Sequence, residues 1–525
     1  MHQLKTIILR DACSRSMLLL KSSSAFQYKR IQRSLFKTNS RMMMNNYGIS
    51  ESIVREFSSN CNFRYIHNDN GDVLTKCPLK SLDNHHTTIP ISIYFHWPFC
   101  QSICSYCDFN RYKRDLSSIQ NLDPRHSDKN IGYQMMKTYL LILEDFKRQV
   151  KVLNPQHNYE LVSIFFGGGT PSTMNPLMME ELISKSMEIF STSREKVEIS
   201  MEANPTSIET EKLLNFHKAG INRLSIGVQS FDSDCLKTLG REHSVDEALY
   251  AIESAKSIFG KDSLSIDLMF GLPQHKTNRT IWEKTLEKAL SLDFSHISLY
   301  QLTIEKNTKF YKLFNEEKDL PNEEEYSDMY DYTIDACQSI GLEMYEVSNF
   351  AKPGKECKHN IMYWRSIYDF IGIGPGAHGR LTNHTTRQRY STVQVLKPED
   401  WIEKASLDFS EARNSNPTLL LGNIKQEALS EMQQIEELFM MGLRMAKEGV
   451  KESSLKYINS GMTFEKLFSS NMITRLIEHD YLSLIEEADG RRMVATRKGI
   501  NVLDILLGTL FGETQRIKHT LRVQI

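Results

Sequence analysis

The chain has 525 residues, of which 40% are hydrophobic and 25% are charged, and its formal net charge is −1. This composition is typical of a globular protein with two or three domains. The balanced charge gives no argument for binding to nucleic acid or to an anionic membrane surface, and no apolar run approaches the roughly 18 residues that a membrane-spanning helix needs. Nine cysteines are too few for a secreted disulfide scaffold.

The first 41 residues differ in composition from the rest of the chain. They contain nine Lys or Arg, seven Ser and a single acidic residue, Asp11. This basic, serine-rich and acid-poor composition predicts a mitochondrial transit peptide at 1–41, with a disordered basic tail as the alternative. Residues 42–86 form a polar extension for which we expect no defined fold. The predicted location is therefore mitochondrial, in the matrix.

From residue 87 to about residue 380, short apolar runs alternate with longer amphipathic stretches. Six runs predict buried strands: Ile91–His96, Leu161–Phe166, Lys196–Ala203, Arg223–Val228, Ser263–Phe270 and His296–Leu302. Helical patterns lie between them, at Pro176–Phe190, Glu209–Ala219, Asp246–Phe259 and Ile281–Leu292. A repeated order of strand and helix predicts an α/β fold with parallel strands and right-handed crossovers.

Polar residues and glycines follow the ends of these predicted strands. Three cysteines follow the first run, and the glycine-rich segment Gly167–Pro171 follows the second. The later runs end at or are followed by Glu202, Asn204, Gln229, Asp267 and Gly271. Active sites of α/β barrels form at the carboxyl ends of the strands, so six units predict a partial barrel with its site at this rim. Any one of these residues, taken alone, is equally compatible with an ordinary turn.

The three clustered cysteines are Cys100, Cys104 and Cys107, with the spacing C-x3-C-x2-C. An iron–sulfur cluster bound by four cysteines is mainly an electron carrier. Three thiolates leave the fourth iron of a 4Fe–4S cluster open to a small molecule. Zinc is the alternative, with His96 or Asp108 as the fourth ligand. The other six cysteines are scattered along the chain.

Beyond Gly379 the pattern changes. Residues 381–429 are largely polar and predict a linker. A helix is predicted from Ser430 to Gly449, followed by more helix and short strand within Phe464–His479, Tyr481–Ile485 and Gly499–Leu507. Residues 430–525 therefore predict a smaller, mainly helical C-terminal domain.

Several motifs together resemble a known family. CxxxCxxC with an aromatic residue inside it, followed by GGGTP after a strand, is the pattern of radical S-adenosylmethionine (SAM) enzymes. Within that superfamily the chain resembles the oxygen-independent coproporphyrinogen dehydrogenase (HemN) family from about Ile91 to its C-terminus. The motifs are YFHWPFCQSICSYCDFNRY, FFGGGTPS, MEANPTS, RLSIGVQSF, GREH and DLMFGLP. This resemblance implies a (βα)6 partial TIM-type barrel with a C-terminal domain of the HemN type.

Two features point to one branch of this family. The dehydrogenase has an additional cysteine two positions after the third cluster cysteine, where this chain has Phe109. The segment HNIMYW, with His359, Asn360, Tyr363 and Trp364, matches the HNxxYW motif of the HemW haem-chaperone branch, which is mitochondrial in eukaryotes. The resemblance implies a protein that binds haem as cargo and passes it to haem-accepting mitochondrial proteins, with an electron donor for its cluster. The alternatives are a coproporphyrinogen III dehydrogenase and a cluster-containing scaffold that binds no haem.

The resemblance also assigns candidate binding residues, and it assigns no catalytic residue. Cys100, Cys104 and Cys107 would bind the 4Fe–4S cluster. The residues implied for SAM are Tyr94, Tyr106, Gly168, Gly169, Thr170, Glu202, Gln229, Arg241 and Asp267. His359 would be an axial ligand of haem iron, with Cys357 as a rival ligand and with Tyr363 and Trp364 against the porphyrin face. The glycine-rich segment Ile371–Gly379 resembles a family loop near the active site, although a plain loop explains it as well.

Overall fold

The computed structural model describes residues 88–123, 130–206, 210–411, 420–487 and 490–512. The predicted transit peptide (1–41) and the polar extension (42–86) lie outside these residues. Within them, no helix is long and apolar enough to cross a membrane.

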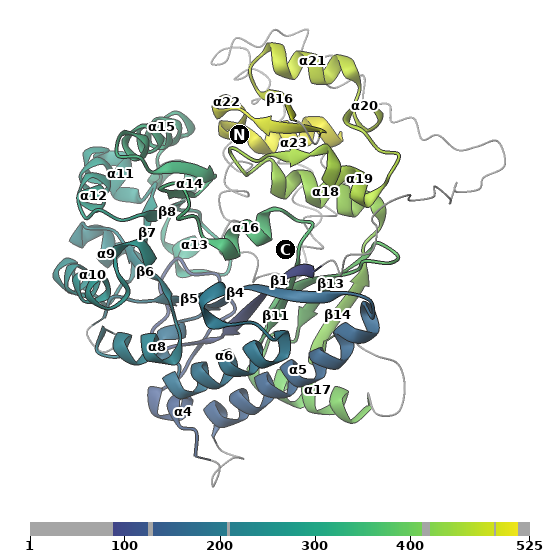
Figure 1. Cartoon of the computed structure of the whole chain (residues 1–525). Coiled ribbons are helices and arrows are strands. Elements are labelled where there is room, and N and C mark those ends of the chain that lie inside the picture. Colours follow the sequence, from purple (N-terminus) through teal and green to yellow (C-terminus); the bar gives the residue numbers. More distant parts are fainter. Residues whose placement is uncertain (1–87, 124–129, 207–209, 412–419, 488–489, 513–525) are drawn as a thin grey trace.

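The centre of the molecule is one large sheet, whose strands run in the order β14-β13-β12-β11-β1-β4-β5-β6-β7-β8-β10-β9 (Figure 1). The seven strands from β11 to β8 are parallel to their neighbours. Six of them are the predicted strands: β1 (Thr88–Trp97), β4 (Asn158–Gly168), β5 (Glu198–Ala203), β6 (Arg223–Gln229), β7 (Leu264–Phe270) and β8 (His296–Gln301). Their order in the sheet is their order in the chain, which confirms the α/β fold. The sheet is open at both edges, as in a partial barrel.

The seventh parallel strand, β11 (Asp369–Ile373), lies in the segment for which a plain loop seemed sufficient. It pairs with β1, with Ile93 opposite Ile371. Gly372 lies inside this strand. A Cβ atom there would lie 2.0 Å from the carbonyl oxygen of His378 on the next strand, so only glycine fits. Its glycine therefore allows a close backbone approach rather than marking a turn.

Antiparallel strands extend both edges of the parallel part. They are β10 (Asn349–Ala351) and β9 (Glu343–Glu346) at one edge, and β12 (His378–Asn383), β13 (Gln388–Gln394) and β14 (Asn423–Ala428) at the other. The prediction of a linker over 381–429 is therefore wrong, since these residues contain β13, α17 (Pro398–Glu411) and β14. A charged residue such as Arg389 suggests an exposed segment from the sequence alone. In the structure it is buried and pairs with Asp369.

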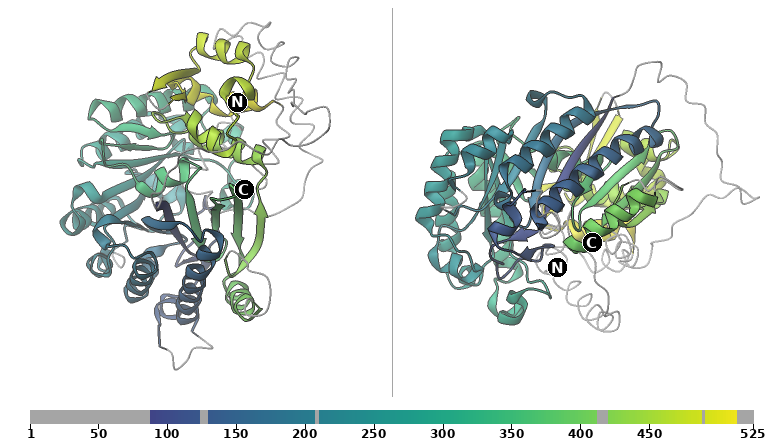
Figure 2. Two further views of the ribbon diagram at one scale, coloured as in Figure 1. Left: turned by 45° about the vertical axis from the view of Figure 1, so that its right-hand side comes forward. Right: turned by 90° about the horizontal axis from the view of Figure 1, so that it is seen from below.

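Helices cover the outer face of the parallel strands (Figures 1 and 2). The long ones are α5 (Ile131–Leu153), α6 (Pro176–Phe190), α10 (Val245–Phe259), α12 (Thr280–Leu290) and α15 (Glu323–Ser339). Shorter helices lie in the connections: α4 (Leu116–Gln120), α8 (Leu213–Ala219), α9 (Ser233–Leu239), α11 (Pro273–Thr277), α13 (Lys309–Leu313) and α14 (Glu316–Asp319). The predicted helix Glu209–Ala219 is shorter in the structure, and its first residue lies outside the described residues.

Successive residues of a strand point to opposite faces, and β1 shows the consequence. Phe95 packs edge-on against Tyr139 of α5, with ring centroids 5.8 Å apart. On the opposite face, which we call the inner face, the hydroxyl groups of Ser92 and Ser163 lie 2.7 Å apart. The apolar residues of each strand thus anchor the helices, while polar residues gather on the inner face.

The C-terminal region is mainly helical, as predicted, and contains a small sheet in the order β15-β17-β16. Its elements are α18 (Glu431–Gly442), β15 (Val450–Lys451), α19 (Glu452–Ile458), α20 (Phe464–Leu467), α21 (Ser470–Glu478), β16 (Leu482–Glu487), β17 (Gly490–Ala495), α22 (Arg497–Asn501) and α23 (Leu503–Phe511). Aromatic rings join them, since Phe439 packs edge-on against Phe464, Phe468 and Phe511.

The HNIMYW segment forms a short helix, α16 (Lys358–Trp364), on the inner face. It contacts β1, β4 and β11 on one side and α18 on the other, so it lies between the large sheet and the C-terminal region (Figure 1). The sequence alone did not indicate this internal position.

Candidate cofactor site

The three cysteines lie on one loop that follows β1. Cys100 ends the two-residue strand β2 (Phe99–Cys100), which pairs with β3 (Tyr112–Lys113), while Cys104 and Cys107 lie between them. Backbone hydrogen bonds hold the loop from two sides: the Ser105 N–H donates to the carbonyl of Leu239, and the Ser105 carbonyl accepts from the N–H of Phe310. The cysteine loop is therefore fixed by segments distant in the sequence.

The glycine-rich segment after β4 packs directly against the start of this loop. The Gly169 N–H donates to the Trp97 carbonyl at 2.6 Å. A Cβ atom at Gly169 would lie 2.8 Å from the Phe99 carbonyl oxygen, and Gly168 has a φ of +112°, which disfavours other residues. These two glycines bring the ends of two strands together at the predicted rim.

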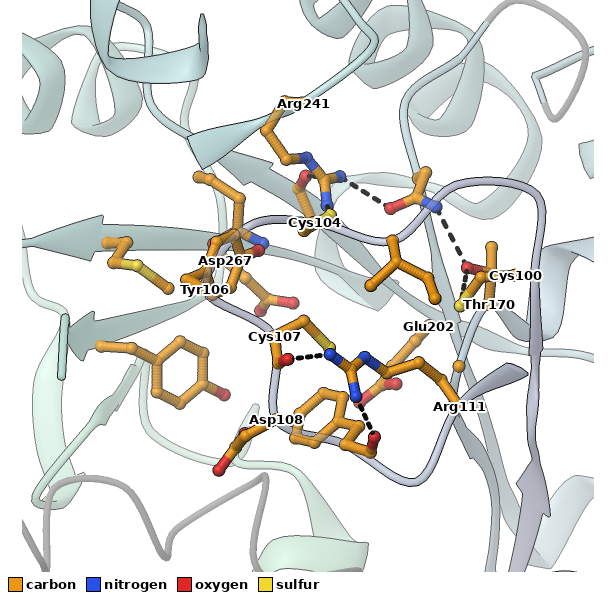
Figure 3. Close-up of a pocket in the computed structure, with 18 of the residues that line it drawn as sticks. Cys100, Cys104, Tyr106, Cys107, Asp108, Arg111, Thr170, Glu202, Arg241 and Asp267 are labelled. Carbon is orange, nitrogen blue, oxygen red and sulfur yellow. Dashed lines mark hydrogen bonds between the residues drawn. The ribbon is translucent and has the colours of Figure 1, made fainter. Parts of the chain in front are cut away.

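All of the predicted site residues except Tyr94 and His359 line a single pocket at the carboxyl ends of the strands (Figure 3). The residues brought together are Cys100, Cys104, Tyr106, Cys107, Gly168, Gly169, Thr170, Glu202, Gln229, Arg241 and Asp267. They come from the cysteine loop, from the ends of β4, β5 and β6, from the middle of β7, and from the turn after α9. The rim that the strand pattern predicted thus forms one connected cavity.

Arg241 connects the cysteine loop to the barrel. Its guanidinium donates to the thiol of Cys104 at 3.3 Å, to Oδ1 of Asn204 at 2.7 Å and to the Gly227 carbonyl at 2.8 Å. A second donor, the hydroxyl of Thr170, lies 3.2 Å from the thiol of Cys100. Donors directed at sulfur stabilise the thiolate form, which is the form that binds iron.

Burial dominates the electrostatics of Cys107. Burial raises the pKa of its thiol far above the ordinary range, and the nearby Arg111 guanidinium only partly opposes this rise. Arg111 also donates to the carbonyl groups of Cys107 and Phe109, so it fixes the end of the cysteine loop. Because iron binds the thiolate, assembly of a cluster must release the proton of Cys107.

Glu202 and Asp267 form a pair of buried carboxyl groups with different pKa values. Burial, together with the charge of Asp267, raises the pKa of Glu202 to about 8. Burial raises the pKa of Asp267 only to about 6, because the Ser225 and Ser298 hydroxyls donate to its ionised form. Near pH 7, Glu202 is therefore mostly protonated and Asp267 mostly ionised. The pocket offers one acidic donor and one anionic acceptor to a ligand.

Two amide side chains in the pocket lack hydrogen-bond partners among the described residues. The Oε1 atom of Gln229 and the Nε2 atom of Gln301 are buried and unpaired, and both residues line the cavity. Gln229 also has a φ of +68°, an unusual conformation for a residue other than glycine. Unpaired polar atoms and backbone strain in a cavity are typical of a ligand-binding site.

The donor set fits a multi-iron cluster better than a single metal ion. Within the part of the chain that the structure describes, no three His, Cys, Asp or Glu side chains are arranged to hold one metal ion. This geometry argues against the zinc alternative. In a 4Fe–4S cluster each thiolate binds a different iron, so three sulfurs around one cavity suffice.

The family model of the radical SAM superfamily matches residues 94–281, the segment that contains every predicted pocket residue. The mitochondrial radical S-adenosyl methionine domain-containing protein 1 of Danio rerio is 32% identical over 435 residues, which cover 82% of this chain and 89% of that protein. The chain belongs to the radical SAM superfamily. A second relative of this radical SAM protein is the heme chaperone HemW of Bacillus subtilis, 33% identical over 424 residues, which cover 80% of this chain and 99% of HemW. These relatives place it in the HemW branch.

A solved structure shares the fold of this radical SAM protein. Coproporphyrinogen III oxidase (HemN) from Escherichia coli superimposes with a TM-score of 0.59 and 18% sequence identity, covering 81% of this chain and 90% of HemN. The similarity confirms the radical SAM α/β fold and, at this identity, shows nothing further.

Tyr94 and His359, the two predicted residues outside the pocket lining, lie together on the inner face. The Tyr94 hydroxyl is 3.0 Å from Nδ1 of His96, and its ring centroid is 6.2 Å from that of His359. His359 stacks on Phe165, with ring centroids 4.8 Å apart and an angle of 22° between the planes. The haem-ligand candidate thus lies outside the set of residues that line the pocket.

The rest of HNIMYW packs into the fold. Trp364 is fully buried, with the Arg444 guanidinium 4.6 Å from its ring and the side chains of Met441 and Met445 around it. Its ring is therefore not open to a porphyrin, in contrast to the prediction. Tyr363 is half-buried and remains accessible.

Sequence reasoning missed several residues that line the pocket. They are Arg111, Met269, Tyr300, Gln301, Thr303 and Glu305, among others. The rule that sites form at strand ends would have found Tyr300 and Gln301, because they end the sixth predicted strand. No sequence signal marks Arg111, whose role depends on its contacts with the folded loop.

Proposed function

We propose that this protein is a haem chaperone of the mitochondrial matrix, which binds haem through His359 and carries a 4Fe–4S cluster with SAM in the pocket. Cys100, Cys104 and Cys107 would hold the cluster. SAM would contact the glycine-rich segment after β4 and the polar residues at the ends of β5 and β6 and within β7. A reduced cluster of this kind supplies a single electron to SAM when both are bound. The chain itself provides the orientation of the donors and acceptors around them.

The geometry of His359 is the observation that carries the haem assignment. Its Nδ1 lies 3.2 Å from the hydroxyl of Ser163, while Nε2 has no partner among the described residues. A hydrogen bond at one imidazole nitrogen fixes the ring and leaves the other nitrogen for iron. Burial lowers the pKa of His359 to about 3, so the ring is neutral and able to bind a metal across the physiological pH range.

The site of the alternative enzyme differs at one informative position. Phe109 lines the pocket where the dehydrogenase branch has a further cysteine. The names of the Bacillus subtilis and Escherichia coli relatives, both heme chaperone HemW, support the chaperone function. Relatives from Danio rerio and Mus musculus are named mitochondrial, which supports the location.

A haem titration of the anaerobically reconstituted protein tests the haem assignment. We expect a Soret shift that His359→Ala weakens by at least tenfold in affinity, since an axial bond is lost. Ser163→Ala should have a smaller effect, because the ring loses its orientation but keeps its nitrogen. The matched control is His217→Ala on α8, where Nδ1 faces the Ile221 carbonyl far from the inner face. An unchanged Soret shift in His359→Ala would exclude His359 as the ligand.

The same proposal requires two kinds of partner: an electron donor for the cluster, and mitochondrial proteins that accept haem. Transfer is tested by mixing the haem-loaded chain with an apo form of a mitochondrial haem protein and following the Soret band of the acceptor. The proposal requires that haem reach the acceptor faster from this chain than from haem-loaded albumin, which is the control. Import is tested by fusing residues 1–41 to a fluorescent protein, which should then enter the matrix.

A further inference from the structure

A chain of buried polar groups crosses the inner face from the pocket to α16. Its members lie on four elements: Asp267 on β7, Ser298 and His296 on β8, Ser265 on β7, Tyr345 on β9 and Asn360 on α16. Asp267 is partly buried at the pocket, and the other members are buried. We call this chain the inner relay. It connects a residue of the pocket to the neighbour of His359.

From Ser298 to Asn360, the links of the inner relay are within hydrogen-bond distance. Ser298 lies opposite Asp267 in the register of β7 and β8, and its hydroxyl helps to lower the pKa of that carboxyl group. The same hydroxyl lies 3.3 Å from that of Ser265. The Ser265 hydroxyl is 2.8 Å from Nδ1 of His296, whose Nε2 is 2.9 Å from the Tyr345 hydroxyl. The amide of Asn360 donates to the same Tyr345 oxygen at 3.2 Å.

The proton positions in the relay follow from its two ends. Asn360 Nδ2 has only protons to give, so the Tyr345 oxygen accepts and its own proton must go to Nε2 of His296. His296 then carries its proton on Nδ1 and donates to Ser265, which donates to Ser298. Ser298 finally donates to Asp267, a carboxylate that only accepts when ionised. Every hydrogen bond therefore points from α16 toward the pocket.

The strength of the hydrogen bonds in this relay depends on its final acceptor, the carboxylate of Asp267. Hydrogen bonds to an ionised acceptor are about twice as strong as neutral ones, and chains of hydrogen bonds strengthen one another. A cationic ligand in the pocket keeps Asp267 ionised, and a carboxylate has about four acceptor positions, so it can accept from the ligand and from Ser298 together. Ligand binding at one end thus stabilises the orientation of Asn360 at the other.

We propose that the inner relay couples the two sites, so that SAM in the pocket fixes α16 and tightens the binding of haem at His359. This inference rests on the proposed function, because it concerns regulation of the same haem site. By thermodynamic reciprocity, haem must tighten the binding of SAM by the same factor. Asp267 faces the ligand in the pocket, whereas the other relay residues act as positioning residues.

Contacts outside the relay also hold the start of α16 and the residues just before it. Glu198 accepts from the backbone N–H of His359 at 3.3 Å and from the thiol of Cys357 at 3.4 Å. Arg223 pairs with Glu198 and also donates to the Lys355 carbonyl at 3.0 Å. A break in the relay should therefore leave the helix folded while removing its connection to the pocket.

The test measures haem affinity of the reconstituted full chain with and without saturating SAM. We expect SAM to tighten haem binding about fivefold or more, the lower end of typical coupling between sites. Ser298→Ala and Tyr345→Phe should each reduce this factor to below about two while haem alone still binds. Three relay residues separate Ser298 from Asn360, so an effect of Ser298→Ala on α16 would have to pass through them. The matched control is Tyr330→Phe, which removes a buried hydroxyl that donates to the Val347 carbonyl outside the relay. An unchanged factor in both relay variants would overturn the proposal.

A second readout separates failure of the relay from failure of the haem assignment. Hydrogen exchange of the backbone amides of residues 358–364 requires no haem. SAM should slow this exchange in the unmodified chain and leave it unchanged in Ser298→Ala. If haem does not bind but this protection is present, the proposed function fails and the relay stands. If SAM protects α16 equally in both proteins, the relay is refuted whatever haem does.

Discussion

The Arg241 guanidinium lies 3.3 Å from the thiol of Cys104 and joins the cysteine loop to the carboxyl ends of the strands. It also holds Asn204 and the Gly227 carbonyl, so one side chain organises three segments of the pocket. A fixed cation beside a cysteine thiolate stabilises the negative charge there. Much of the pocket geometry therefore depends on a residue of the short GREH motif.

Replacing Arg241 should weaken both cofactors. Arg241→Gln keeps a donor but loses the charge, and a hydrogen bond to a charged group contributes about 1.5–3 kcal/mol. We expect SAM affinity to fall by about 10- to 100-fold and the iron content after reconstitution to fall as well, as measured by equilibrium dialysis and iron analysis. Arg279→Gln is the control, because Arg279 forms ion pairs only on the exposed surface. Equal SAM affinity in Arg241→Gln and the unmodified chain would show that Arg241 has no role in the site.

The buried carboxyl group of Glu202 should make the cluster-free protein less stable as the pH rises. Its pKa is about 8 in the folded chain against a reference of 4.5, so the folded state keeps a proton that the unfolded state releases between these values. The free energy of unfolding should therefore fall between pH 5 and pH 8, by at most about 1.4 kcal/mol per pH unit for this group. Glu202→Gln should flatten the fall in urea titrations, whereas Glu253→Gln on the exposed face of α10 should not. A pH dependence that Glu202→Gln leaves unchanged would contradict the assignment.

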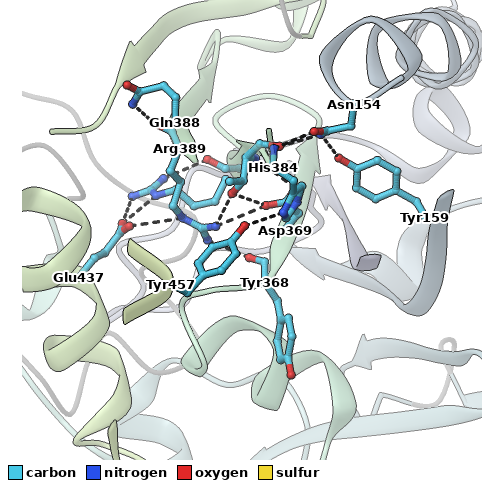
Figure 4. A network of polar contacts seen from close by, with 12 residues as sticks. Asn154, Tyr159, Tyr368, Asp369, His384, Gln388, Arg389, Glu437 and Tyr457 are labelled. Carbon is cyan, nitrogen blue, oxygen red and sulfur yellow. Dashed lines mark hydrogen bonds and ion pairs between the residues drawn. The ribbon is translucent and has the colours of Figure 1, made fainter. Parts of the chain in front are cut away.

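Buried charges join the C-terminal region to the large sheet (Figure 4). Glu437 of α18 pairs with Arg380 at 2.6 Å and lies 3.8 Å from Arg389, which in turn pairs with Asp369 at 3.4 Å. Glu437→Gln leaves the buried Arg380 without its acidic partner and removes one of the two acidic groups beside Arg389, so we expect a loss of about 3–5 kcal/mol in the free energy of unfolding. Glu448→Gln, which breaks a partly exposed pair with Arg365, should cost less than about 1 kcal/mol. Similar losses in the two variants would show that the buried cluster is not a structural clamp.

Haem binding should be insensitive to pH between about 5 and 8. Ligation needs a neutral imidazole, and the lowered pKa of His359, about 3, keeps it neutral over this whole range. A histidine with an ordinary pKa near 6.5 would lose about 30-fold in affinity by pH 5, because protons compete with iron. Haem titrations at pH 5.5, 6.5 and 7.5 measure the difference. A tenfold loss at the lowest pH would indicate a solvent-exposed ligand instead of His359.

The sequence predicted the parallel part of the fold and most of the pocket because both follow from local patterns. Strand ends are visible as apolar runs that stop at polar residues, and parallel strands bring those ends to one rim. Glu202, Gln229 and Asp267 could therefore be placed together before the structure was known. The same rule extends to Gln301, which sequence reasoning passed over.

Features that depend on distant contacts were not predictable in this way. Gly372 indicated a loop, but it lies in a strand. The residue is glycine because a neighbouring backbone approaches it closely. Arg389 suggested an exposed linker, although Asp369 and Glu437 neutralise it inside the fold. His359 and Trp364 belong to one motif, yet tertiary packing leaves the first half-buried and buries the second completely.

The central claim is that the chain binds haem and does not convert coproporphyrinogen III. The direct measurement applies both assays to one anaerobic, reconstituted sample: a haem titration, and incubation of coproporphyrinogen III with SAM and a reductant. The account predicts a saturable Soret shift and no protoporphyrinogen. Formation of protoporphyrinogen without haem binding would contradict it and assign the chain to the dehydrogenases.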